Sequence, residues 1–193
     1  MTPPPIETIT CLSVQQPYAS AIFFDGKWCE NRSWPTTYRG ELWIHASRLD
    51  QQMLDDAAAL EVDLNEIWPD RLHTGCLLGR VNLIGCFPAT TLLAAASSEA
   101  LKAMGLNKRN QPPVTPSISH DVEFIKSHLS GVDPLTWSHF TQSQFAWLLA
   151  DAEYILNPYP IPGKLKLWSA DIPSHLLTLM DWEGVDPQGS AID

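Results

Sequence analysis

Bases and aromatic residues alternate in one stretch of the chain, residues 26–48. The stretch has four bases and two acids, a local charge of +2, interleaved with three tryptophans and a tyrosine: Lys27, Trp28, Glu30, Arg32, Trp34, Tyr38, Arg39, Glu41, Trp43 and Arg48. Aromatic rings stack on nucleobases, and basic side chains bind phosphates. The stretch therefore predicts a site for single-stranded nucleic acid or a nucleoside. The alternative is that its tryptophans are core and its arginines are solvated.

Lys27 and Glu30 are the candidate catalytic side chains of this stretch. A desolvated lysine can act as a base or nucleophile, and otherwise it can bind phosphate or be an ordinary turn lysine. A glutamate can act as a general base or accept a hydrogen bond from the amino group of a nucleobase. If residues 28–32 are extended, Glu30 and Arg32 share a strand face. An ion pair between them is then the structural alternative, while the functional one has Arg32 holding phosphate.

A short helix is predicted from Pro17 to Phe24, because proline is tolerated in a first turn and Gly26 is a helix stop. Gln16 and Pro17 stand at its N-terminus. They either cap the helix or help it to present an anion-binding end to a ligand. Ser20, one turn along, is placed to hydrogen-bond the same ligand.

The loop that follows supplies the other candidate ligand-binding residues, Ser33, Trp34, Tyr38 and Arg39. Aromatic residues in loops are more informative about function than those in strands. Trp34 is the predicted stacking ring, and Arg39 is a predicted phosphate ligand. His45 shares a strand face with Trp43 and is expected to be a hydrogen-bonded core histidine. If it faces the ligand instead, it is the group that titrates near neutral pH.

The remaining pattern predicts an α+β domain, a small β-barrel with helices in its connections. Strand character recurs at residues 9–14, 41–47, 75–86, 145–156 and 165–168. Helical spacing appears at 53–67, 90–104 and 121–129, and the proline-rich stretch 105–119 is expected to be an exposed loop. No strand–helix–strand rhythm and no internal repeat is visible.

The overall charge limits the partners of this 193-residue chain. It has 22 acids and 12 bases, a net charge of -10, which argues against non-specific coating of duplex DNA. Seven of the acids lie in residues 49–70 and five in residues 171–193, and neither segment contains lysine or arginine. The acids are therefore concentrated outside the basic stretch, which leaves room for a compact site for a few nucleotides.

The cysteines and the N-terminus predict a cytoplasmic protein without disulfides. Cys11, Cys29, Cys76 and Cys86 have no metal-ligand spacing, so no metal site and no cofactor are expected. The N-terminus lacks the basic start and apolar run of a signal peptide, and no stretch approaches the length that spans a bilayer.

Several sequence blocks, taken in order, resemble the ASCH (activating signal cointegrator homology) family, small β-barrels of the PUA-like superfamily. The blocks are LSVQQPYAS at 12–20, GKWCENRSW at 26–34, YRGELWIHA at 38–46, GCLLGRVNL at 75–83, PIPG at 160–163, and Trp168. The pattern is closer to the cointegrator-type branch than to the very short bacterial members. We expect one ASCH domain at residues 9–183 with insertions at about 48–74 and 88–140, a flexible lead at 1–8 and a tail at 184–193.

The resemblance implies a cleft beside the first helix, with Lys27 at its lip, that accepts RNA, single-stranded nucleic acid or a nucleoside. Relatives divide between nucleic-acid binding, ribonuclease action and removal of the acetyl group from N4-acetylcytidine. In the deacetylating branch a lysine acts with a threonine three positions later and a distant glutamate. Lys27 matches that lysine, but Glu30 stands at the threonine position.

Three functions follow as hypotheses. The first is binding of single-stranded RNA or DNA, or of a modified nucleotide, in the cleft. The second is a hydrolase, an amidohydrolase or ribonuclease, that uses Lys27 and Glu30 in the same cleft. The third is a protein-interaction module that binds an unspecified protein through the acidic segment around residues 50–70, including Asp55, Asp56 and Glu61.

Overall fold

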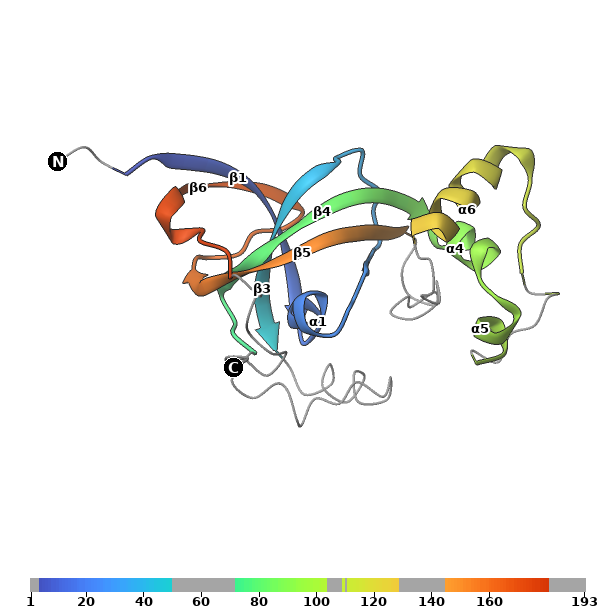
Figure 1. The fold of residues 1–193 in the computed structure, drawn as a ribbon, viewed down its shortest axis with the longest axis horizontal. Helices are drawn as coiled ribbons and strands as arrows, with labels where there is room; N and C mark the ends of the chain where they lie inside the picture. Colours follow the sequence, from blue (N-terminus) through green and yellow to red (C-terminus); the bar gives the residue numbers. More distant parts are fainter. Residues whose placement is uncertain (1–3, 50–71, 104–108, 110, 129–144, 181–193) are drawn as a thin grey trace, which may run out of the picture. The chain divides into compact units, whose positions relative to one another are not determined.

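The computed structural model describes residues 4–49, 72–103, 109, 111–128 and 145–180 (Figure 1). Six of its strands form a sheet in the order β2-β5-β4-β3-β1-β6. β1 pairs in parallel with β3 and antiparallel with β6, and β2 pairs antiparallel with β5. The strands are β1 (Ile6–Gln16), β2 (Cys29–Arg32), β3 (Gly40–Leu49), β4 (Cys76–Pro88), β5 (Phe145–Pro160) and β6 (Leu167–Pro173).

Short helices occupy several connections, and together with the sheet they confirm the predicted α+β class. They are α1 (Tyr18–Phe24), α4 (Ala89–Ala95), α5 (Ser98–Ala103), α6 (Pro116–His128) and the 3₁₀ helix η1 (Ser174–Leu176). The strand order begins at β2 and ends at β6, so over the described residues the sheet is not closed into a barrel. This arrangement is compatible with a PUA-like fold. None of the described helices is both long and apolar enough to cross a membrane.

The chain divides into two compact units. The first unit contains Met1–Lys27, Gly40–Asn82 and Ala150–Asp193, and the second contains Trp28–Arg39 and Leu83–Leu149. Each of the long strands β4 and β5 contributes residues to both units. The expectation of one domain over residues 9–183 stays a prediction.

The core of the first unit is built on β1, which lies between β3 and β6 in the sheet. The register places Cys11 opposite Trp43 and Ser13 opposite His45. The buried residues of this core are Ile9, Cys11, Trp43, Leu77, Ile155, Trp168, Ile172 and Leu177. Residues 42–46 of β3 are all buried, so both faces of that strand are covered.

Helix α1 belongs to the first unit and packs through its C-terminal aromatic residues. The rings of Phe23 and Phe24 lie 5.6 and 4.8 Å from the ring of Tyr154 on β5. Gly79 on β4 makes this packing feasible, because a Cβ there would lie 2.7 Å from Cε1 of Phe23 and 2.9 Å from Cα of Tyr154. The helix is thereby held against the strands that carry Gly79 and Tyr154.

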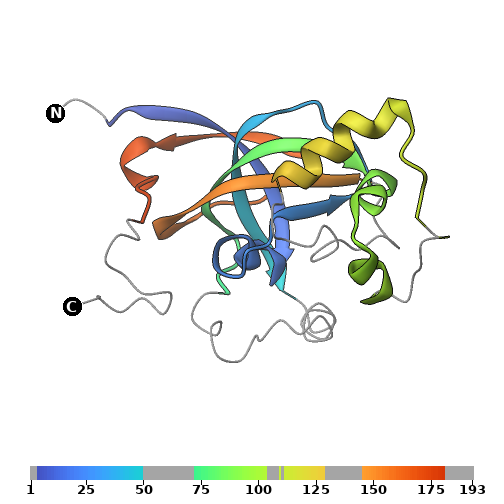
Figure 2. The same ribbon diagram turned by 45° about the vertical axis from the view of Figure 1, so that its right-hand side comes forward.

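The second unit has its own core, in which α4 and α6 contact each other (Figures 1 and 2). The rings of Phe87 and Phe124 lie 5.9 Å apart at one side of it. The buried residues of this core are Trp28, Cys29, Leu92, Ala94, Ala95, Val122, Ile125, Ala146 and Leu148. β2 therefore packs in the same core as α4 and α6, two helices of the segment expected as an insertion, residues 88–140.

The structure extends or divides several predicted elements. β1 begins at Ile6, inside the stretch expected as a lead, and β6 continues to Pro173. The helix predicted at 90–104 is two helices, because Ala96 adopts an extended conformation between them. The loop predicted at 105–119 is wrong at its end, since α6 begins at Pro116, a residue well suited to a first helical turn. The helix predicted at 53–67 and the tail at 184–193 lie outside the described residues.

Candidate nucleic-acid interface

Gln16 and Ser20 join the end of β1 to the start of α1 in the first unit. The Gln16 Oε1 atom accepts a hydrogen bond from the Ser20 backbone N–H at 3.1 Å, and its Nε2 donates to Ser20 Oγ at 2.9 Å and to the carbonyl of His73 at 2.7 Å. Gln16 and Ser20 are fully buried, and Pro17 follows Gln16 through a cis peptide bond. Gln16 thus accepts a hydrogen bond from a backbone N–H in the first turn of α1, and the anion-binding alternative for this helix end stays a prediction.

Lys27 lies just beyond the C-terminus of α1. Gly26 has a φ of +63°, and this turn brings the backbone N–H of Lys27 to within 3.0 Å of the Ala21 carbonyl oxygen. The Lys27 residue is only 3% exposed, so it is buried rather than placed at an open lip. Asp25, at the same helix end, has its carboxyl pKa raised by burial.

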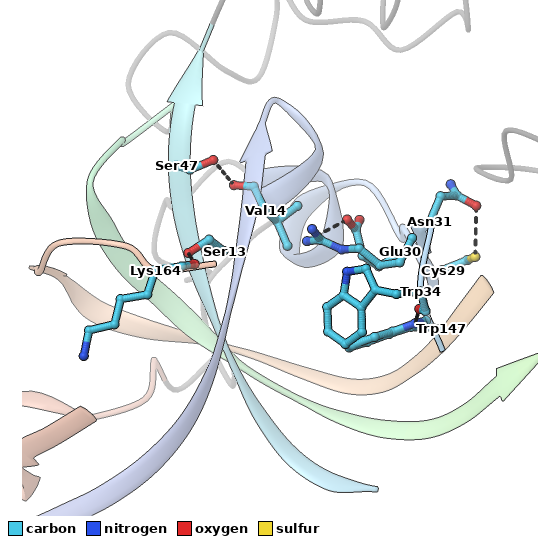
Figure 3. Close-up of polar contacts among 10 residues, drawn as sticks. Ser13, Val14, Cys29, Glu30, Asn31, Trp34, Ser47, Trp147 and Lys164 are labelled. Carbon is cyan, nitrogen blue, oxygen red and sulfur yellow. Dashed lines mark hydrogen bonds and ion pairs between the residues drawn. The ribbon is translucent and has the colours of Figure 1, made fainter. Parts of the chain in front are cut away.

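Glu30 and Arg32 form an ion pair on β2 in the second unit. Arg32 Nη2 lies 3.1 Å from Glu30 Oε1, and the two side chains are 22% and 10% exposed (Figure 3). Residues two apart on a strand point to the same face, so the predicted pairing is confirmed. The Glu30 carboxylate is therefore held in position by the Arg32 guanidinium.

Trp34 is half-buried and packs edge-on against the buried Trp147 of β5. The ring centroids are 4.6 Å apart with an interplanar angle of 84°, and Trp147 Nε1 donates to the Trp34 carbonyl at 3.3 Å (Figure 3). β2 pairs Glu30 directly with Trp147, so the strand that carries the ion pair also lies against the residue that fixes Trp34. The indole predicted to stack on a base is thus held from one side.

The loop from Ser33 to Arg39 is stabilised by its own polar groups. Arg39 Nη1 donates to the carbonyls of Thr36 and Tyr38 at 3.1 and 2.7 Å, and the Tyr38 backbone N–H donates to Thr36 Oγ1 at 3.1 Å. Ser33 and Arg39 are exposed, and Tyr38 is half-buried. The loop is therefore ordered by local hydrogen bonds, and Arg39 remains exposed.

His45 is a core histidine of the first unit. It is 2% exposed, its Nε2 lies 2.9 Å from the Ile161 carbonyl, and its ring meets that of Trp168 edge-on at 5.8 Å. The carbonyl can only accept, so Nε2 carries a proton. Burial lowers the pKa of His45, an effect that the bond to Ile161 partly opposes. The histidine expected to titrate if it faced a ligand is instead held neutral.

This burial makes stability depend on pH. Because the folded-state pKa of His45 is lowered, the unfolded chain takes up a proton first as the pH falls below about 6.5. Stability is complete above that pH and declines below it, by up to about 1.4 kcal/mol per pH unit. Urea unfolding at pH 7 and 5.5 is expected to show a smaller loss for His45→Gln than for the wild type. The exposed His120→Gln is the control, and equal losses in all three proteins would contradict the assignment.

The buried cysteines are unsuited to nucleophilic chemistry. Burial raises the thiol pKa of Cys11 to about 12, against a smaller opposing effect of Lys164, and raises that of Cys76 to about 11. Thiolate is the reactive form, so these two groups are inert near neutral pH. All four cysteines of the chain are free.

The predicted site residues divide between the two units. Gln16, Pro17, Ser20, Lys27 and His45 belong to the first unit, whereas Glu30, Arg32, Ser33, Trp34, Tyr38 and Arg39 belong to the second. Within the second unit, β2 and its loop bring the ion pair and the Trp34 ring together. That Lys27 and Glu30 share one cleft stays a prediction.

Trp147 packs against Trp34 and was not among the site residues predicted from the sequence. It lies 113 residues from Trp34, and the contact depends on the register of β2 against β5. The aromatic and aliphatic composition of residues 145–156 predicts a strand, but it holds no signal for this partner. The contact could be predicted only if the antiparallel pairing of residues 29–32 with residues 145–148 were known.

An α+β fold with a six-stranded sheet and a helix after the first strand is compatible with a PUA-like module. The ASCH domain matches residues 12–158 of this chain. The chain therefore belongs to the ASCH domain family.

Curated relatives agree with that assignment. The chain is similar to activating signal cointegrator 1 of Homo sapiens, with 26% identity over 171 residues, which cover 86% of this chain and 23% of that protein. The same protein of Mus musculus is 27% identical over 170 residues, with the same coverage. The chain thus spans less than a quarter of the length of these relatives. The family is one to which binding of RNA or other nucleic acid is generally attributed.

Proposed function

We propose that this chain binds single-stranded RNA, or a modified nucleotide, through the 30–39 segment of its second unit. The observation that carries the proposal is the half-buried Trp34 indole, fixed edge-on by Trp147, in a segment of an ASCH domain that is locally basic. Because Trp147 already fixes the Trp34 ring, little side-chain entropy is lost when a base stacks on it.

Charged groups around this ring supply the remaining recognition. Arg39 is exposed and positioned by its bonds to the loop carbonyls, which suits it to a backbone phosphate. Glu30, which is paired with Arg32, is the proposed acceptor for the exocyclic amino group of a base. The net charge of -10 opposes long polyanions, so we expect modest affinity and a preference for a few nucleotides.

The hydrolase alternative has weaker support from the contacts. The Glu30 carboxylate is engaged by the Arg32 guanidinium, which fits the structural ion pair that the strand pattern predicted. The deacetylating pattern also requires threonine where Glu30 stands. We therefore place hydrolysis of an amide or phosphodiester by Lys27 and Glu30 second, to be tested by incubation with N4-acetylcytidine and an RNA panel.

A cytoplasmic location is part of the proposal, because four free cysteines are typical of a reducing compartment. The third hypothesis, a protein partner for the acidic segment around residues 50–70, falls mainly on residues outside the described ones.

The test is binding of fluorescein-labelled single-stranded RNA followed by fluorescence anisotropy. Trp34→Ala is expected to weaken binding by about 1–3 kcal/mol, or about 5- to 150-fold, because one stacked base is lost. Tyr159→Ala is the control, because it removes another half-buried aromatic ring, in the first unit. It is expected to leave the affinity for RNA within about twofold of wild type. Wild-type binding should also weaken as salt increases.

Two results would contradict the proposal. The first is absence of salt-sensitive binding by the wild-type protein. The second is equal affinity of Trp34→Ala and wild type when both are folded by circular dichroism.

A further inference from the structure

The turn between β5 and β6, residues 163–166, presents an unusual combination of side chains in the first unit. Lys164 and Lys166 are exposed, and Leu165 between them is 93% exposed. The other exposed large hydrophobic residues that the structure describes have smaller exposed fractions, such as 61% for Ile6. From Tyr154 to Ala170 the chain has these two bases and no acid, although acids outnumber bases 22 to 12 overall. The turn is therefore a basic and apolar tip on an acidic protein.

The base of this turn is held firmly by β1 and β3. Ser13 Oγ donates to the Lys164 carbonyl at 3.0 Å, and the Lys164 side chain extends away from that contact (Figure 3). Gly163 lies so close to His45 that an added Cβ would be 2.7 Å from Nδ1 and 2.9 Å from Ser13 Oγ. Ile161, two residues before Gly163, is held through both of its backbone polar groups. Its carbonyl accepts from His45 Nε2, and its N–H donates to the Gly75 carbonyl. The tip is thus displayed on a rigid support.

Two further features characterise the backbone and the side chains of this turn. Lys166 has a φ of +60°, a conformation that glycine or asparagine adopts at lower cost, and such strain is concentrated at ligand clamps and switches. The Lys164 ammonium lies 5.4 Å from the centroid of the Trp168 ring, so it is steadied by a cation–π contact. A lysine held this way loses less freedom when it meets an anion.

We propose that the 163–166 turn is a second contact for single-stranded nucleic acid, with Lys164 and Lys166 binding backbone phosphates and Leu165 packing against a base or sugar. The inference rests on the proposed function and names a further binding site for the same ligand class. An anionic lipid surface is a poorer occupant, because one leucine and two lysines fall short of the two signals that stable membrane anchoring needs.

The experiment measures the salt dependence of RNA binding by anisotropy between 50 and 200 mM salt. Each phosphate contact on a single strand contributes about 0.7 to the slope of log K against log salt, so Lys164→Gln/Lys166→Gln should reduce the slope by about 1.4. The ratio of wild-type to variant affinity should then fall about sevenfold across that range. Lys102→Gln/Lys126→Gln, which neutralises two exposed lysines of α5 and α6, is the matched control and should leave the slope unchanged.

Leu165→Ala retains both charges and is expected to lower affinity at every salt concentration with no change of slope. A slope that is unaltered by the Lys164/Lys166 pair, or altered equally by the control pair, would overturn the second contact while leaving Trp34-dependent binding intact. Absence of wild-type binding would overturn the proposed function as well. Turn-dependent binding to phosphatidylserine vesicles in place of RNA would assign the turn to lipid and overturn the inference.

Discussion

Gly79→Ala is expected to lower the free energy of unfolding by about 3 kcal/mol, at the upper end of the usual cost of overpacking. The added Cβ would contact the Glu153 carbonyl oxygen and would lie 2.7 Å from Phe23 Cε1 and 2.9 Å from Tyr154 Cα. Two of these three atoms belong to the backbone of β5 and cannot rotate away. Urea unfolding should show the loss directly, with a fall in Tm of about 6–12 °C.

Gly85→Ala is the matched control, because it adds the same methyl group to the same strand, β4. Its nearest neighbours are all atoms of the Phe87 ring, a side chain that can move. We expect a cost below about 1 kcal/mol, partly offset by the reduced freedom of alanine in the unfolded chain. If both variants were equally stable, the close packing of Phe23 and Tyr154 around Gly79 would not matter to the fold.

Local signals explain the elements that could be predicted from the sequence. Pro17 and Gly26 bracket α1 because one is tolerated in a first turn and the other adopts a positive φ. Strand character at residues 41–47 predicted β3, but it did not predict that residues 42–46 are all buried. Burial of both faces depends on what the rest of the chain packs there, which periodicity within one strand does not contain.

Two helix boundaries could not be predicted, because the residue types there are compatible with more than one structure. Pro116 was read as part of a loop, yet proline is equally suited to the first turn of α6. The break between α4 and α5 falls at Ala96, a good helix former, so no residue type marked it.

The candidate site was predictable only where its contacts are short-range. Glu30 and Arg32 are two residues apart, and strand periodicity alone placed them on one face. The burial of Lys27 and His45 depends on the packing of distant segments, and so does the position of Trp34 against Trp147. Residue type identified which side chains could bind a nucleotide, and tertiary packing decided which of them are accessible.

Trp147→Ala is expected to have the largest effect, a loss of about 3–5 kcal/mol in the free energy of unfolding. Trp147 is fully buried, and its removal leaves a cavity beneath Trp34 and takes away the hydrogen bond to the Trp34 carbonyl. If Trp34 stacks on a base, the loss of this support should also weaken RNA binding. Both effects are measurable, stability by urea unfolding and affinity by anisotropy.

Leu148→Ala separates the two effects, because it creates a similar cavity one residue further along β5. Leu148 is 1% exposed and packs in the helix-covered core with Trp28 and Leu92, so its truncation should cost about 2–5 kcal/mol. At a temperature where both variants are folded, RNA affinity should fall for Trp147→Ala and stay near wild type for Leu148→Ala. Equal affinities would show that Trp147 supports the fold without positioning Trp34, since a general loss of stability lowers both alike.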